Sequence, residues 1–137
     1  MTNKEKSLIA GKRLARKLAA LAFDRMGFDI ELIDVRRVCD YTNYFLFVSG
    51  KNRVHLDALK ERLFEGAKEA GAKAHGMDGA AASGWIIMDF GDLIVHIFTP
   101  DAKKYYDLMS IWGDGKPVEM DPAAPVAKPK TSSKKRK

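Results

Sequence analysis

The side chains best suited to chemistry in this 137-residue sequence are three histidines, one cysteine and scattered carboxylates. His55, His75, His96 and Cys39 lack the CxxC, HxH or HxxxH spacing that brings metal ligands together. Ser49-Gly50 lacks the GxSxG pattern of a serine nucleophile. Neither GxGxxG nor a GxxxxGKS/T phosphate loop is present. The sequence therefore predicts no catalytic residue, no metal site and no cofactor.

Two further patterns resemble parts of enzyme sites. Asp89-Phe90-Gly91 matches the metal-binding triplet of protein kinases, but the chain lacks an HRD catalytic loop and is much too short for a kinase. Nucleotidyl transfer would need a Gly-Ser turn followed by two carboxylates, one residue apart on a strand. Here Ser49-Gly50 is followed by Lys51, and the nearest pair, Asp29-x-Glu31, precedes the turn. The sequence favours a binding protein over an enzyme.

The segment Trp85–Phe98 combines apolar, aromatic and polar residues around Gly91-Asp92, and this pattern predicts a β-hairpin. One face of the hairpin is wholly apolar and carries Ile86, Met88, Phe90, Leu93, Val95 and Ile97. The other face mixes aromatic with polar groups and carries Trp85, Ile87, Asp89, Ile94, His96 and Phe98. Moving the turn by one residue would leave this division unchanged, because side chains alternate along each strand.

Helices must position this hairpin. Leucines at helical spacing predict a helix near residues 5–25, ended by Gly27. A second helix ends before Gly71, and one of its faces is marked by Leu56, Leu59, Leu63 and Ala67. A third helix follows the hairpin, with Thr99 as N-cap and Pro100 at its first position. Its predicted apolar stripe is Ala102, Tyr105, Tyr106 and Met109, and Trp112 and Gly113 are expected to close the domain.

Short β-rich runs lie between the first two helices, at Ile30–Val35 and Tyr44–Val48, and a further strand is expected near Ala74–Met77. Tyr44–Val48 is apolar throughout, which is typical of an interior strand covered on both faces. The order of the elements predicts an α/β domain with a mixed β-sheet of about four to five strands and packed helices.

Most of the net charge of +6 lies at the C-terminus, because residues 121–137 hold six of the 24 Lys and Arg residues but one of the 18 Asp and Glu residues. We expect one folded domain over residues 1–120 and a disordered tail, rich in Pro, Ala and Lys, over 121–137. No run is apolar enough for a membrane span or a signal peptide, so we expect a cytoplasmic protein.

Two basic segments are candidates for RNA contact. They are Lys12, Arg13, Arg16 and Lys17 on the first helix, and Lys134, Lys135, Arg136 and Lys137 in the tail. Such residues can follow a phosphate backbone without sequence specificity. The alternatives are an ordinary solvated helix face, a contact with an acidic partner, and a tail that only keeps the protein in solution.

One run of residues resembles the central motif of the Iojap or ribosomal silencing factor family. The matching residues are Gly84, Trp85, Asp89, Phe90, Gly91, Asp92, Val95, His96, Phe98, Tyr105, Tyr106, Leu108, Trp112 and Gly113. Upstream, Asn43–Gly50 resembles the family's Asp-Tyr-Phe-x-Ile-x-Ser-Gly block, with Asn43 in place of the commoner Asp. The resemblance covers about residues 5–115 and leaves out the basic tail.

This resemblance implies a nucleotidyltransferase-like topology without the catalytic carboxylates, and a partner rather than a substrate. The implied partner is the fourteenth protein of the large ribosomal subunit, on the intersubunit face, where occupancy would block joining of the small subunit and repress translation under nutrient limitation. The alternatives are a large-subunit assembly factor or a general RNA-binding module, and then a residual nucleotidyltransferase. Either a monomer or a homodimer fits.

The motif and the mixed face of the hairpin together give the candidate partner-binding residues. They are Trp85, Ile87, Asp89, Phe90, Asp92, His96, Phe98, Tyr105 and Tyr106. Aromatic side chains mixed with polar groups are the usual composition of interface anchors. Structural roles are the alternative: Trp85 and Phe98 could pack under the third helix, His96 could be a satisfied core histidine, and Asp92 could only stabilise the turn.

Overall fold

A six-stranded mixed sheet forms the centre of the computed structural model, which describes residues 2–107 and 115–118. In chain order the elements are α1 (Asn3–Asp24), β1 (Phe28–Asp34), β2 (Tyr44–Ser49), α2 (Arg53–Glu69), β3 (Gly76–Ala80), η1 (Ala81–Ser83), β4 (Trp85–Asp89), β5 (Leu93–Phe98), α3 (Pro100–Tyr105) and β6 (Lys116–Val118). The strands lie in the order β3-β4-β5-β2-β1-β6. This confirms the expected α/β class with a mixed sheet.

The sheet has one strand more than the upper end of the prediction. The additional strand is β6, which pairs antiparallel with β1 at the edge of the sheet. Its three residues include Pro117, which cannot donate a backbone hydrogen bond and is tolerated at a sheet edge. A run this short gives no recognisable alternation in the sequence. At the opposite edge, β3 begins two residues later than the expected strand at Ala74–Met77.

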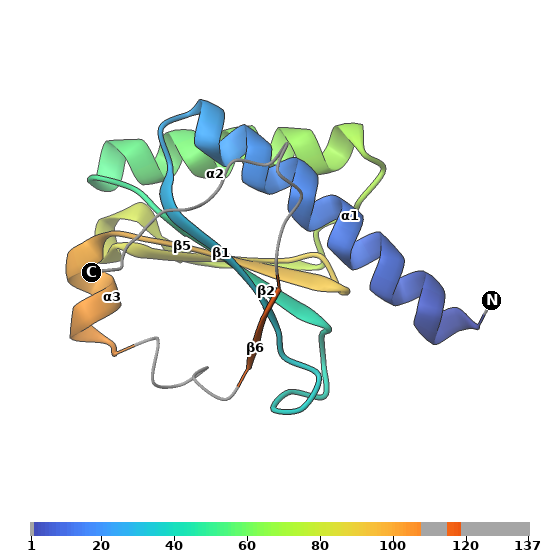
Figure 1. The fold of residues 1–137 in the computed structure, drawn as a ribbon. Helices are drawn as coiled ribbons and strands as arrows, with labels where there is room; N and C mark the ends of the chain where they lie inside the picture. The colour runs from blue at the N-terminus through green and yellow to red at the C-terminus, as the bar shows by residue number, and fades with distance from the viewer. Residues whose placement is uncertain (1, 108–114, 119–137) are drawn as a thin grey trace.

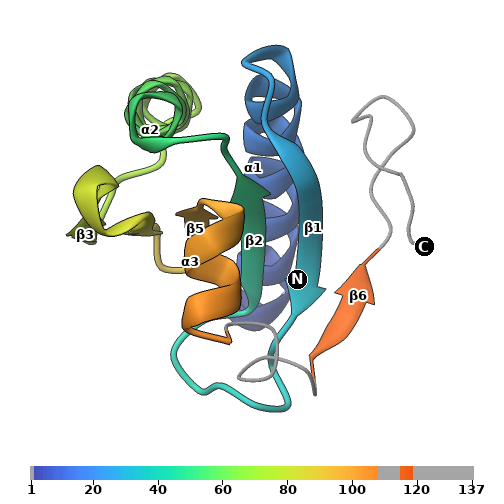
Figure 2. The same cartoon turned by 90° about the vertical axis from the view of Figure 1, so that its left-hand side faces the viewer.

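Helices α1 and α2 lie together on one face of the sheet, and α3 follows β5 toward the other face (Figures 1 and 2). The sequence predicted all three helices, and Thr99 caps α3 as expected, accepting a hydrogen bond from the Ala102 backbone N–H. Among the described residues, no helix is long and apolar enough to cross a membrane.

The C-terminal end of α1 differs from the prediction in one residue. The chain leaves the helix through Met26, whose φ of 69° lies in the left-handed region, and the Gly27 N–H then donates to the Ala22 carbonyl oxygen at 2.8 Å. This is the Schellman arrangement, in which glycine usually takes the left-handed position. Here Gly27 follows that position. Its backbone lies so close to Ala22 and Val48 that a side chain would not fit.

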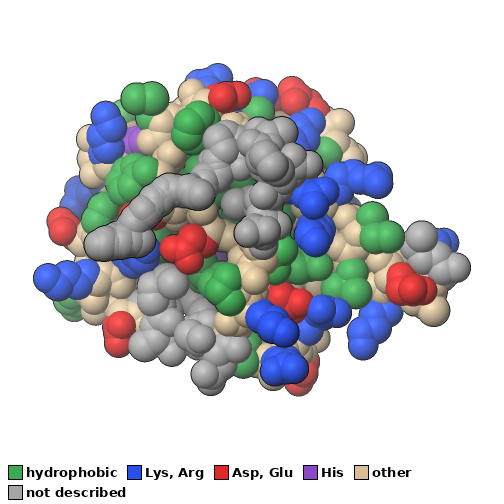
Figure 3. All heavy atoms as spheres, in the orientation of Figure 1, with side chains coloured by type: hydrophobic (Ala, Val, Ile, Leu, Met, Phe, Trp, Pro, Cys, Tyr) green, Lys and Arg blue, Asp and Glu red, His purple; other side chains and the backbone are tan. Residues whose placement is uncertain are grey.

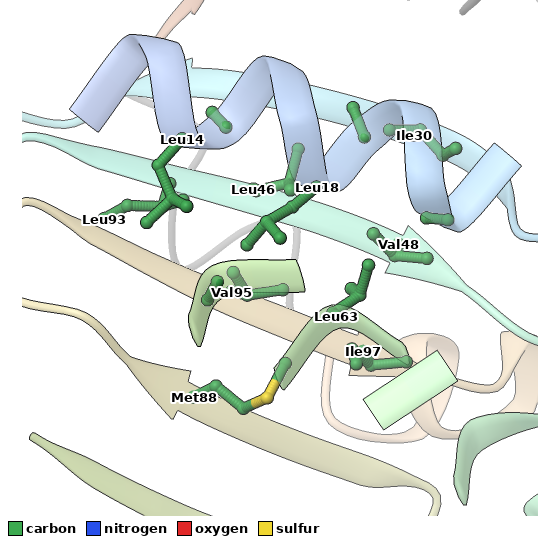
Figure 4. Close-up of a cluster of buried hydrophobic side chains, with 14 of the residues drawn as sticks. Leu14, Leu18, Ile30, Leu46, Val48, Leu63, Met88, Leu93, Val95 and Ile97 are labelled. Atoms are coloured by element: carbon green, nitrogen blue, oxygen red, sulfur yellow. The ribbon is translucent and has the colours of Figure 1, made fainter. Parts of the chain in front are cut away.

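The main core lies between the sheet and the pair of helices α1 and α2. Figure 4 shows side chains from α1, α2, β2, β4 and β5 meeting there, Leu18, Leu63 and Val95 among them. Strand β2 is buried along its whole length, as predicted for an interior strand. Its Leu46 and Val48 face this core, whereas Phe45 and Phe47 belong to a second cluster on the other face of the sheet. That second cluster supports the candidate site.

Candidate partner-docking surface

The hairpin of β4 and β5 has the predicted register. Trp85 pairs with Phe98, Ile87 with His96, and Asp89 with Ile94. The Phe90 N–H donates to the Leu93 carbonyl oxygen at 2.9 Å and closes the turn at Gly91-Asp92. The division of side chains between the two faces is therefore also as predicted.

The apolar face of the hairpin packs under α1 and α2. All six of its side chains are buried in the main core: Ile86, Met88, Phe90, Leu93, Val95 and Ile97. Phe90 was also among the candidate contact residues because it belongs to the family motif. Its side chain is 7% exposed and faces the helices. In this conformation Phe90 therefore has almost no surface to offer a partner, and its place in the motif is explained by the core.

The mixed face carries the second cluster, and burial separates its members into two groups. His96 and Phe98 are 3% and 0% exposed, so both are core side chains with almost no surface available in this conformation. The structural alternative holds for Phe98, which packs with Ala102 of α3. Trp85, Ile87 and Asp89 are half-buried, and each presents part of its side chain at the surface.

Trp85 is held in place by His96, which lies on the same face of the hairpin on the neighbouring strand. Its indole Nε1–H donates to Nδ1 of His96 at 3.2 Å, and the two rings stack with centroids 6.1 Å apart. Burial lowers the pKa of His96 to about 4, so the imidazole is neutral at physiological pH and Nδ1 can accept this hydrogen bond. The ring of Phe45 packs edge-on against His96 at 4.8 Å. His96 is therefore a positioning residue for Trp85.

The aromatic contacts continue outward from Trp85 to α3. Tyr106 lies 5.3 Å from the Trp85 ring, and Tyr105 meets Tyr106 edge-on at 4.9 Å. Exposure rises along this aromatic row, from His96 through Trp85 and Tyr106 to Tyr105, which is 82% exposed. Among the described residues of the predicted apolar stripe of the third helix, only Ala102 is buried. Tyr105 and Tyr106 face outward, and Met109, Leu108, Trp112 and Gly113 lie outside the described residues.

The two acidic candidates both have partners within the chain. Asp89 accepts a hydrogen bond from the Gly91 N–H at 2.8 Å and so stabilises the turn. Asp92 accepts a hydrogen bond from the Ser7 hydroxyl of α1, and Ser7 in turn accepts one from the Asn43 amide at 2.8 Å. Asn43, which departs from the family's commoner Asp, thus has a structural role. Both carboxylates are half-exposed, and each retains oxygen lone pairs for a partner.

Sequence reasoning missed one residue beside this surface. Tyr41 is 66% exposed, in the loop between β1 and β2. Partial desolvation raises the pKa of Tyr41, and the neighbouring Cys39 thiol and the negative charge of Asp89 raise it further. Tyr41 therefore lies within the electrostatic range of Asp89. A lone tyrosine in an irregular loop has no periodicity, so the sequence carried no signal for it.

The basic candidates fall into two groups. On α1, Arg13 and Arg16 are exposed, whereas Lys12 and Lys17 are half-buried at the sides of the helix. Lys17 forms an ion pair with Glu69 of α2 at 3.7 Å. The tail residues Lys134, Lys135, Arg136 and Lys137 lie outside the described residues. In the part of the chain that the structure describes, no three His, Cys, Asp or Glu side chains are grouped as metal ligands would be.

These features define a small mixed α/β domain that presents an aromatic and acidic surface beside its central hairpin. Residues 9–137 match the family model described as ribosomal silencing factor during starvation, and the chain belongs to that family. The resemblance found in the hairpin motif is thereby confirmed.

Similar proteins and structures agree with this assignment. The chain is 29% identical to the ribosomal silencing factor RsfS of Bacillus subtilis over 110 residues, which cover 80% of this chain and 93% of that protein. It is 30% identical over 98 residues to a mouse protein named mitochondrial assembly of ribosomal large subunit protein 1, covering 69% of this chain and 43% of the mouse protein. A crystal structure of a Chromobacterium violaceum protein superposes with a TM-score of 0.71 at 26% identity, covering 79% and 90% of the two chains.

Proposed function

We propose that this protein docks on the fourteenth protein of the large ribosomal subunit, at the face that meets the small subunit. In this position it blocks subunit joining and represses translation when nutrients are limited. Membership of the silencing-factor family supports a ribosome-associated silencing role. The particular partner and the blocked step follow from the resemblance of the hairpin motif. The protein acts in the cytoplasm, as a monomer or a homodimer.

The aromatic row is the observation that carries the proposal. Trp85 is half-buried and is held by a hydrogen bond to the buried His96, while Tyr105 and Tyr106 extend the aromatic surface outward. Interface hot spots are enriched in Trp and Tyr, and a side chain that is already fixed loses little conformational entropy when a partner binds. Asp89 lies on the same face of the hairpin and can pair with a basic residue of the ribosomal protein.

The mechanism requires binding and no chemical step. A domain seated on the intersubunit face occupies space that the small subunit needs, so the degree of repression follows the fraction of large subunits that carry the protein. The relatives named in the comparisons as silencing factors support this role, and we propose that the protein is not an enzyme.

An assembly role is the second candidate. The name of the mouse relative describes assembly of the mitochondrial large subunit. The same docking surface would serve an assembly factor, which would bind precursor particles and not only mature subunits. A general RNA-binding module and a residual nucleotidyltransferase remain as the more distant alternatives.

The decisive experiment combines cosedimentation with purified large subunits and an assay of subunit joining. Wild-type protein should sediment with large subunits and prevent their joining to small subunits. Tyr105→Ala should weaken binding about tenfold or more, because it removes an exposed anchor of the row. Trp85→Ala and Asp89→Lys should weaken binding further in folded protein.

Val54→Ala is the matched control, because Val54 is 79% exposed and lies on α2, outside the aromatic row. It should bind as wild type does. The proposal fails if wild-type protein does not bind large subunits at moderate salt, or if Tyr105→Ala and Trp85→Ala bind unchanged. Binding that leaves joining of mature subunits unaffected would favour the assembly role.

A further inference from the structure

The two long helices of this domain differ in how many of their basic side chains are paired with acids. On α2, two of the four basic side chains are paired with acids of the same helix: Lys60 with Asp57 at 3.5 Å, and Arg62 with Glu65 at 3.1 Å and with Glu69 at 3.9 Å. On α1, Lys6, Lys12, Arg13 and Arg16 form no ion pair with any described residue, and Lys17 alone reaches an acid, Glu69. Lys6, Lys12, Arg13, Arg16 and Lys17 are called the basic face of α1 below.

The placement of these charges is unfavourable for the helix itself. Lys12 and Arg16 are four residues apart, as are Arg13 and Lys17, so like charges are neighbours along the helix surface. Lys6 also lies in the first turn of α1, where the positive end of the helix dipole disfavours cations, and the last turn, where cations are favoured, holds no basic residue. Glu69 offsets the repulsion at Lys17 alone, and the uncompensated charges of Lys12, Arg13 and Arg16 point to a requirement outside the fold.

The basic face is available to a partner. The buried side of α1 is formed by Leu14, Ala15, Leu18 and Ala22, and Arg13 and Arg16 lie on the exposed side. Lys6 to Arg16 spans about 15 Å of helix, at about 1.5 Å per residue. Figure 3 shows blue Lys and Arg side chains gathered along α1. Ser7 of the same helix holds Asp92 at the hairpin turn, so α1 is fixed relative to the docking surface.

We propose that the basic face of α1 binds the phosphate backbone of ribosomal RNA beside the docking site. This inference rests on the proposed docking of the aromatic row, which provides the specific anchor. The basic face then adds affinity that depends on salt and not on base sequence, because bound Lys and Arg side chains release counterions from the RNA. Arginine is suited to this contact, since its planar guanidinium can donate two hydrogen bonds to one phosphate.

The composition of the face favours RNA over an acidic protein surface. The centre of a protein interface is depleted of charged residues and rich in aromatic and apolar ones. Between Lys6 and Lys17, the one exposed large apolar side chain is Ile9, and the remaining exposed positions are basic or alanine. Interfaces with nucleic acid are more polar and far more positively charged, and this is the composition of the basic face.

The test measures affinity for purified large subunits as a function of salt, with full-length protein. Arg13→Ala/Arg16→Ala is the test variant, and Lys68→Ala/Lys73→Ala is the control that removes the same charge from two exposed lysines elsewhere. The logarithm of the association constant falls linearly with the logarithm of the salt concentration, and loss of two phosphate contacts should make this slope shallower by about 1.5. When salt is raised from 50 to 200 mM, the factor by which affinity falls should therefore be about eight times smaller for the variant than for wild type. The control should keep the wild-type slope.

A short RNA duplex serves as the second probe, because it separates RNA from protein partners. The test variant should bind the duplex more weakly than the control at low salt. Equal slopes for the test variant and wild type on large subunits would overturn the inference. A reduced slope on subunits with unchanged duplex binding would also overturn it, because it indicates an acidic protein surface. If wild-type protein does not bind subunits at all, the proposed docking fails, and the duplex measurement still decides whether the basic face binds RNA.

Discussion

Trp85 donates its indole hydrogen to Nδ1 of a neutral, buried His96, and these two residues are diagonal neighbours on one face of the hairpin, on adjacent strands. His96 has almost no exposed surface, whereas Trp85 is half-exposed. The hydrogen bond thus joins the second core cluster to the surface where docking is proposed. Protonation of His96 at Nδ1 would place two donors against each other, so the contact depends on the neutral imidazole.

This dependence predicts a loss of stability in mild acid. The pKa of His96 is lowered to about 4 in the folded protein from its ordinary value of 6.5, so between these values the unfolded chain binds more protons than the folded one. The stabilisation is fully present above about pH 6.5 and is lost as the pH falls toward 4. The difference corresponds to about 3 kcal/mol in the free energy of unfolding. Urea denaturation at a series of pH values measures it.

His96→Gln provides the control for this prediction. The glutamine carbonyl can still accept the Trp85 hydrogen bond, but it does not titrate in this range. Its stability should change less than that of wild type between pH 6.5 and 4. An equal slope in the two proteins would show that other groups cause the acid sensitivity.

The fold could be predicted from the sequence wherever a periodic pattern coincides with a local signal. The register of β4 and β5 followed from alternation around Gly91-Asp92, and the burial of Tyr44–Val48 followed from its uniformly apolar composition. Strand β6 could not be predicted, because three residues give no period and its pairing with β1 spans most of the chain. The left-handed Met26 was also missed, since glycine is the expected residue at such a position.

The site was predicted less well than the fold, because burial depends on contacts between distant segments. The alternation rule placed His96 and Phe98 on the mixed face correctly, but it could not show that the second cluster covers them. The contact of Tyr106 with Trp85 and the hydrogen bond from Ser7 to Asp92 join residues 21 and 85 positions apart. Only the structure distinguishes an exposed Tyr105 from a buried Phe98.

The contact of Ser7 with Asp92 predicts a measurable role for the start of α1. Ser7→Ala removes the hydroxyl that donates to Asp92 and leaves the Asn43 amide without its acceptor. The free energy of unfolding should fall by about 1 kcal/mol in urea denaturation. Lys6→Ala, on the neighbouring exposed position, should leave the stability within about 0.5 kcal/mol of wild type. A loss of stability in both variants would point to the helix as a whole and not to the contact.

At Gly79 of β3, adding a single methyl group should have a larger effect on stability than at any other position near Trp85. Its φ of 80° lies in the left-handed region, and an added Cβ would lie against the backbone carbonyl oxygen of Trp85. Gly79→Ala should therefore combine backbone strain with displacement of β3 from β4, and should lower the free energy of unfolding by about 2 kcal/mol or more.

Gly76 lies on the same strand and is the matched comparison for Gly79. No heavy atom lies within 4 Å of the position that a Cβ would occupy there. Gly76→Ala should be neutral or slightly stabilising in thermal unfolding, because it only restricts the unfolded chain. In large-subunit binding, Gly79→Ala should weaken docking through displaced Trp85, whereas Gly76→Ala should not. Equal effects of the two substitutions on stability would show that β3 does not constrain the backbone at Trp85.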